Sequence, residues 1–147
     1  FADLSSSCDQ IFICGISMGA LLAMNLSVLF PVKGLISVAP VLEFNKPFKI
    51  HILNPLICNI LKWRFKKYEI NKGQYIYYGY NKWPLVALNE LRKLSKYIYK
   101  HIVHNITCPT LLIHSTADKV SLFNNYTIMN IFCFFGYNRK IIIFFNL

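Results

Sequence analysis

Residues 11–23 constrain the fold of this chain more than any other stretch. An apolar run leads into the pattern Gly15-x-Ser17-x-Gly19, and small and apolar residues follow it. This order predicts a short buried strand at about 10–14, a tight turn with Ser17 at its apex, and a helix from about 17 to 30. In such a turn the serine hydroxyl is held clear of the sheet by a strained backbone. We expect glycine to be needed at positions 15 and 19, because a side chain at either would clash with neighbouring backbone.

The turn marks Ser17 as a candidate nucleophile. The helix that follows would direct its unpaired N–H groups and its positive end at the reaction centre. The Met18 N–H is the candidate donor to a developing oxyanion. An alternative is a glycine-flanked turn inside a buried helix or a membrane segment, because residues 11–32 carry no charge over 22 positions, enough to span a bilayer. The glycines and polar residues in this run, with Pro31 after the helix, favour the strand and helix.

The next elements predict an α/β fold with a parallel sheet. A second buried strand is expected at 34–40, so that strand, helix and strand form a βαβ unit with a right-handed crossover. Further strands are expected at 108–115 and at 140–145, where the sequence is rich in isoleucine and phenylalanine. A helix is expected at roughly 122–135.

The middle of the chain interrupts this alternation. We expect a core formed by residues 1–43 and 103–147, with an insertion at about 44–102 made of helices and loops. Four leucines at helical spacing after Pro84 predict one amphipathic helix in the insertion. They are Leu85, Leu88, Leu91 and Leu94.

The net charge of +10 is concentrated in this insertion. Residues 46–100 hold twelve Lys and Arg against only Glu69 and Glu90. A basic surface can attract anionic lipid, nucleic acid or acidic substrates, although a solvated lysine-rich face is the simpler interpretation. Nothing matches a known nucleic-acid-reading motif, so no nucleic-acid partner is expected. A peripheral membrane contact through the insertion stays open.

The cysteines indicate a reducing environment. Five cysteines form an odd set without a Cys-x-x-Cys pair, which argues against a disulfide framework and a zinc site. We therefore expect a cytoplasmic protein, and no signal peptide is visible at the start of the sequence.

Residues 11–23 with 34–41, and residues 106–120, resemble the carboxylesterase/monoacylglycerol lipase group of the α/β-hydrolases. By this resemblance Ser17 is the nucleophile, Asp118 is the acid of the catalytic triad, and the Met18 N–H contributes to the oxyanion hole. The order of serine before aspartate agrees with that fold. The resemblance also implies that the insertion is a lid, that the substrate is a small ester or lipid, and that no metal or cofactor takes part.

The sequence departs from the family pattern at both ends. The triad histidine would fall about two residues beyond Leu147, and the family's first strands and its His-Gly loop, which gives the second oxyanion donor, are missing. We therefore expect the central and C-terminal part of a hydrolase, poorly soluble by itself because an apolar sheet edge is exposed. His114 is expected to be structural. Solvent exposure is expected for three further histidines: His51, His101 and His104.

Three functional hypotheses follow. The complete parent protein would be a serine carboxylic-ester hydrolase. The isolated chain would instead be a catalytically inactive remnant, because serine without a base is a poor nucleophile. A third hypothesis is a membrane-associated basic protein. Peptidase, thioesterase and acyltransferase chemistry use the same turn, and the sequence indicates neither the substrate nor the oligomeric state.

Overall fold

The computed structural model describes residues 1–65, 82–116, 118, 121, 125 and 140–145. The chain divides into two compact units. Unit 1 comprises residues 1–45 and 94–147, and unit 2 comprises residues 46–93. The helix expected at 122–135 lies outside the described residues, apart from position 125. The division expected at 44–102, and its role as a lid, stay predictions.

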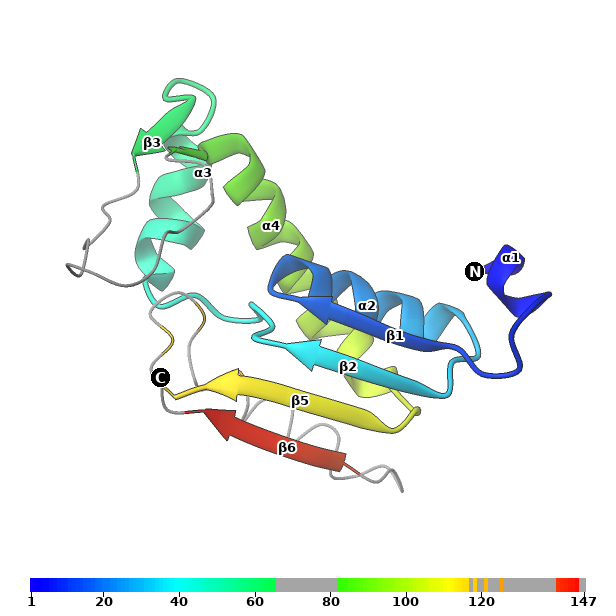
Figure 1. The fold of residues 1–147 in the computed structure, drawn as a ribbon. Coiled ribbons are helices and arrows are strands. Elements are labelled where there is room, and N and C mark those ends of the chain that lie inside the picture. The colour runs from blue at the N-terminus through cyan, green and yellow to red at the C-terminus, as the bar shows by residue number, and fades with distance from the viewer. Residues whose placement is uncertain (66–81, 117, 119–120, 122–124, 126–139, 146–147) are drawn as a thin grey trace, which may run out of the picture. The chain divides into compact units, whose positions relative to one another are not determined.

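The described residues of unit 1 form a parallel sheet of four strands (Figure 1). Its strands, in spatial order, are β1 (Phe12–Ile16), β2 (Gly34–Val38), β5 (Thr110–Ser115) and β6 (Lys140–Phe145). This confirms the predicted α/β architecture with a parallel sheet. Strand β1 ends two residues later than expected, because Gly15 and Ile16 still pair with Ser37 and Val38 of β2.

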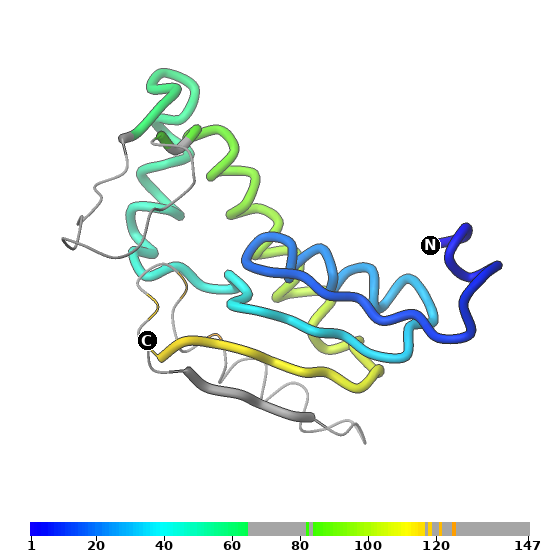
Figure 2. Tube along the Cα trace, viewed as in Figure 1, coloured from blue at the N-terminus to red at the C-terminus, as the bar shows by residue number. Residues whose placement is uncertain are grey.

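Helix α2 (Met18–Leu29) packs on β1 and β2, as Figure 2 shows. Its small and apolar residues form much of the core: Ala20, Leu21, Ala23 and Met24 are almost fully buried. The helix ends before Pro31, with extended backbone at Phe30. The chain reaches β5 through η2 (Ile98–Ile102) and η3 (Val103–Asn105), of which η2 also contacts α2.

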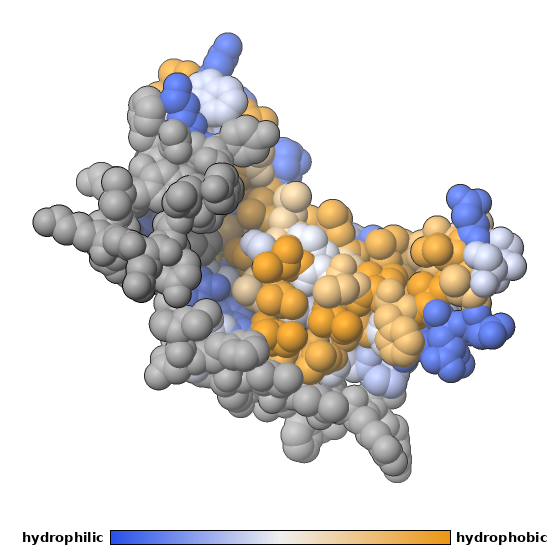
Figure 3. Space-filling view, viewed as in Figure 1, coloured by the Kyte–Doolittle hydropathy of each residue, from blue (hydrophilic) through white to orange (hydrophobic). Residues whose placement is uncertain are grey.

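Strand β1 lies at one edge of the sheet formed by the described residues. Large apolar side chains are exposed here: Phe12 is 59%, Ile16 is 67% and Met18 is 51% accessible. In Figure 3 apolar side chains gather over this part of unit 1. An exposed apolar edge favours association between chains. This exposure is the reason for expecting poor solubility of the isolated chain, which stays a prediction.

Unit 2 holds helices and one strand pair. Its elements are η1 (Lys49–Leu53), α3 (Asn54–Ile57), β3 (Trp63–Phe65), β4 (Lys82–Pro84) and the first part of α4 (Leu85–Tyr97). The side-chain amide of Asn54 donates to the Leu85 carbonyl at 3.1 Å, which links α3 to the start of α4. The antiparallel pair β3–β4 was missed by the sequence analysis, since three-residue strands carry too little pattern to be recognised.

A short helix, α1 (Ala2–Ser5), precedes β1. Within the described residues, none of the helices combines the length and the apolar character that crossing a bilayer requires.

Candidate active site

Ser17 occupies a strained turn between β1 and α2. Its backbone has φ 55° and ψ −115°, a region that costs a residue with a side chain about 1–3 kcal/mol. The Ser17 N–H donates to the Val38 carbonyl at 2.8 Å, and the Ser17 carbonyl accepts from the Ala20 N–H at 3.2 Å. The sheet and the helix therefore hold this conformation from both sides, and the residue itself is exposed.

The two glycines that flank Ser17 have different roles. A Cβ placed on Gly15 would lie 2.1 Å from the Gly19 carbonyl oxygen, so no side chain fits. A Cβ on Gly19 would meet nothing within 4 Å. The expectation for Gly15 is supported, but the expected clash at Gly19 is wrong. Crowding at this turn arises where the Gly19 carbonyl approaches the strand, and the Cα–H of Gly19 points into open space.

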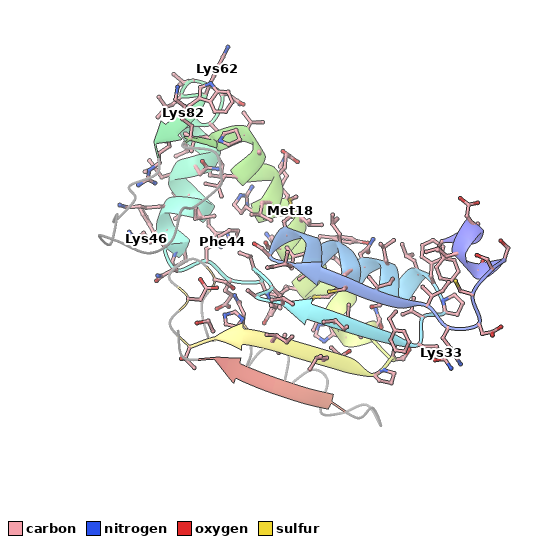
Figure 4. All side chains as sticks on the ribbon, in the orientation of Figure 1. Met18, Lys33, Phe44, Lys46, Lys62 and Lys82 are labelled. Carbon is pink, nitrogen blue, oxygen red and sulfur yellow. The ribbon has the colours of Figure 1, made fainter. Side chains whose placement is uncertain are left out.

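Met18 is the first residue of α2, at the carboxyl edge of the sheet. The first N–H groups of a helix have no acceptor within the helix. Figure 4 labels Met18 beside the end of β1 and Phe44 beyond the end of β2, whereas Lys33 marks the opposite edge of the sheet. This location suits a donor to a group bound next to Ser17, and the oxyanion role stays a prediction.

Asp118 lies just beyond the end of β5. One carboxylate oxygen, Oδ1, accepts a hydrogen bond from the Ser121 N–H at 3.1 Å. The other, Oδ2, lies 4.0 Å from His114 Nε2. The His114 side chain is fully buried and that of Asp118 is 19% exposed. The Asp118 carboxylate is therefore partly accessible, whereas the His114 side chain belongs to the core, as a structural residue would.

Ser17 and Asp118 follow two strands that flank β2. Because β1 and β5 both run parallel to β2, their C-terminal ends lie on the same side of the sheet (Figure 1), and Ser17 and Asp118 follow these two ends in sequence. The end of β2 links them through backbone hydrogen bonds. Val38 accepts from Ser17, and the Ala39 N–H donates to the Ile113 carbonyl at 2.8 Å. The alternative of a glycine-flanked turn inside a buried helix or a membrane segment is wrong, since the turn joins strand β1 to helix α2.

Sequence reasoning missed two buried polar residues beside this edge, Ser121 and Asn125. The Ser121 hydroxyl donates to the Pro40 carbonyl at 2.6 Å. The Asn125 amide bonds both backbone groups of Glu43. These partners lie more than 80 residues away along the chain, so no local pattern could have identified them.

The remaining histidines and Cys108 lie away from the candidate active site or are exposed to solvent. His51, His101 and His104 are exposed, as expected. Burial raises the pKa of the Cys108 thiol, against hydrogen bonds with Ser27 and Thr110 that lower it. Cys108 also precedes β5, so it lies near the N-terminal ends of the strands, whereas Ser17 follows the C-terminal end of β1. No cluster of three or more metal-binding side chains occurs in the part of the chain that the structure describes.

Comparison with known proteins establishes the fold. No protein-family model matches the chain, and no curated protein matches it in sequence. Among solved structures, it is similar to a metagenome-derived lipolytic enzyme, with a TM-score of 0.77 at 20% identity over 99% of this chain and 58% of that one. A soluble variant of monoglyceride lipase from Saccharomyces cerevisiae matches with a TM-score of 0.70 at 12% identity, over 99% of this chain and 55% of that one.

A third similar structure is the monoacylglycerol lipase of Paleococcus ferrophilus, with a TM-score of 0.67 at 17% identity over 99% of this chain and 62% of that one. The chain thus spans between 55% and 62% of the length of these three proteins. All three align with nearly the whole sequence while sharing few residues with it. The chain therefore has the α/β-hydrolase fold and spans part of the length of these three structures.

Proposed function

We propose that the complete protein, meaning the full reading frame that contains this sequence, hydrolyses carboxylic esters with Ser17 as nucleophile. The single observation that carries the proposal is an exposed serine in a strained strand-to-helix turn, at the sheet edge where Asp118 follows β5. The similarity to a lipolytic enzyme and two monoglyceride lipases supports an ester or monoacylglycerol-like substrate. Its acyl or alcohol group would be of modest to long chain.

The proposed reaction follows from the chemistry of these groups. Ser17 Oγ attacks the carbonyl carbon while its proton passes to a histidine, and the Met18 N–H donates to the oxyanion. The tetrahedral intermediate then expels the alcohol, which takes the proton from the histidine, and water hydrolyses the acyl-enzyme by the same route. Asp118 orients the histidine and stabilises its protonated form. We assign the histidine to the complete protein and not to His114, because the His114 side chain is fully buried.

A fluorophosphonate probe on the complete protein tests this assignment. We expect labelling of the wild type and none of Ser17→Ala, while Ser6→Ala, which changes an exposed serine remote from the sheet edge, labels normally. Asp118→Asn should lower kcat by about 10⁴-fold, because the neutral amide favours the wrong histidine tautomer. Labelling that survives Ser17→Ala would overturn the proposal.

For the isolated chain we propose the second reading, a catalytically inactive remnant. A serine at its free pKa is a weak nucleophile without a base. Residual catalysis in enzymes without a triad depends on a complete oxyanion hole, and Met18 offers one donor. We expect no turnover of p-nitrophenyl esters by the 147-residue chain. Turnover that is lost in Ser17→Ala would refute this reading.

A further candidate function is peripheral contact of unit 2 with an anionic lipid surface. Large apolar side chains are exposed on this unit: Phe48 (67%), Leu56 (69%), Ile60 (86%) and Trp63 (54%). Figure 4 labels three of its lysines: Lys46, Lys62 and Lys82. Apolar side chains with basic neighbours are the combination that binds anionic interfaces.

Vesicle flotation tests this contact. We expect the complete protein to float with phosphatidylserine-containing vesicles and to float less with purely zwitterionic ones. Ile60→Asp should weaken binding, while Glu90→Gln, which alters an exposed residue of the same unit, should not. Equal flotation with both lipid compositions would refute the electrostatic contribution.

We also propose a reducing, cytoplasmic location. Within the described residues, four cysteines form no disulfide: Cys8, Cys14, Cys58 and Cys108. Unpaired thiols are typical of reducing compartments.

A further inference from the structure

Side-chain hydrogen bonds connect the loop after β2 to the loop after β5. We propose that Ser121 and Asn125 are positioning residues, which hold the Asp118 carboxylate at a fixed place relative to Ser17. This inference rests on the proposed function, since it assigns Asp118 the role of the triad acid. It concerns two residues for which neither the motifs nor the fold gave a role.

Ser121 contacts Asp118 directly. Its N–H donates to Asp118 Oδ1 at 3.1 Å, which fixes one oxygen of the carboxylate. Ser121 is 1% exposed, and its hydroxyl donates to the Pro40 carbonyl at 2.6 Å. It also forms an isolated antiparallel bridge with Phe44. The N–H that holds Asp118 is therefore set in place by the loop after β2, well away from Asp118 in sequence.

Asn125 holds Ser121 and the same loop. Its side chain is fully buried. Oδ1 accepts from the Glu43 N–H at 2.6 Å, and Nδ2 lies 3.0 Å from the Glu43 carbonyl. Nδ2 also lies 2.7 Å from Ser121 Oγ and 3.2 Å from the Pro40 carbonyl. Because the amide oxygen must face an N–H and the amide nitrogen must face carbonyls, these contacts fix one orientation of the side chain.

The same loop is joined to the nucleophile. Val38, at the end of β2, accepts the Ser17 N–H at 2.8 Å, and Pro40 follows two residues later. Hydrogen bonds thus connect both Ser17 and Asp118 to one short segment, residues 38–43. Ser17 bonds this segment directly, and Asp118 is connected to it through Ser121 and Asn125. Since a displacement of 1 Å in a catalytic group can cost about 100-fold in rate, loss of these hydrogen bonds should reduce the rate of catalysis.

Steady-state kinetics of the complete protein tests the inference. We expect Ser121→Ala and Asn125→Ala each to lower kcat about tenfold while KM changes less than about twofold, because only alignment is lost. Ser95→Ala is the matched control. The Ser95 hydroxyl is equally buried and donates to the neighbouring Val41 carbonyl at 2.7 Å, and among the described residues the bond that holds Asp118 comes from Ser121. Its kcat should equal that of the wild type.

Asn125→Ala removes several buried hydrogen bonds and can prevent folding. Ser121→Ala removes only the hydroxyl and retains the N–H that contacts Asp118, so it provides the kinetic comparison in that event. A double-mutant cycle then separates positioning from general damage. In an Asp118→Asn background, Ser121→Ala should cause no further loss of kcat, because its effect acts through the carboxylate. Additive losses would overturn the inference.

The outcomes distinguish the two proposals. If Asp118→Asn leaves kcat unchanged, the proposed triad acid is wrong, and the positioning role is lost with it. If Asp118→Asn lowers kcat as expected but Ser121→Ala behaves like Ser95→Ala, the ester-hydrolase proposal stands and the positioning role alone is overturned.

Discussion

The turn after β1 and the loop after β5 lie at the same edge of one sheet, yet they are held in different ways. The turn is fixed by backbone groups. Gly15 packs against the Gly19 carbonyl, and Ser17 bonds the adjacent strand. The loop is fixed by side chains, Ser121 and Asn125, whose partners are 81 to 85 residues distant. The first arrangement follows from a few consecutive residues, whereas the second exists only once the chain has folded.

Gly15→Ala should cause the largest loss of stability, because it disrupts the backbone packing of the turn. The new methyl group would overlap the Gly19 carbonyl, and this carbonyl belongs to α2, so relief requires moving the helix off the sheet. We expect the free energy of unfolding of the complete protein to fall by at least about 3 kcal/mol. Urea unfolding measures this change.

Gly19→Ala is the control for this prediction. Its Cβ would lie in open space at the start of α2. Alanine is favoured over glycine inside a helix by about 1 kcal/mol, so stability should hold or rise slightly. Equal losses from the two substitutions would show that the turn tolerates no side chain at either glycine, and the contrast between them would be wrong.

Asn125→Ala should cause a smaller loss of stability, because it removes side-chain hydrogen bonds that hold the loop after β5. The change leaves both partly buried backbone groups of Glu43 without this partner, while the Pro40 carbonyl still accepts from the Ser121 hydroxyl. Each unsatisfied buried group costs about 1–3 kcal/mol, although water can enter and lessen the loss. We expect the free energy of unfolding to fall by about 2–3 kcal/mol, compared with about 1 kcal/mol for Ser95→Ala. Similar losses in both variants would mean that the loop does not depend on Asn125.

The same contrast explains what could be predicted from sequence. The βαβ order, the parallel sheet and the strand at 140–145 follow from apolar runs and turn residues, and the structure confirms them. Ser17 was predicted from the Gly-x-Ser-x-Gly motif and Asp118 from the family resemblance of residues 106–120, and their catalytic roles stay predictions. The role of Gly19 was misjudged, since a motif tells which residue type occurs and cannot tell which atom is crowded.

Long-range partners explain the remaining misses. The end of β1 was placed too early, because its last two pairs depend on β2 and not on apolar pattern. Ser121 and Asn125 look like ordinary polar residues in a loop and a helix, and their burial comes from a segment near position 40. The end of β1 and the burial of Ser121 and Asn125 thus depend on contacts between segments far apart in the chain.

The smallest effect we predict tests whether the turn stores strain in its own backbone. Ser17→Gly and Ser17→Ala both remove the hydroxyl, but only glycine adopts φ 55° without steric cost. After allowing for the greater flexibility of glycine in the unfolded chain, Ser17→Gly should be more stable than Ser17→Ala by about 1 kcal/mol. Thermal unfolding of the two variants of the complete protein measures this as a difference of a few degrees in Tm. Equal stability would mean that the turn carries no local strain and depends, like the loop after β5, on contacts made elsewhere in the fold.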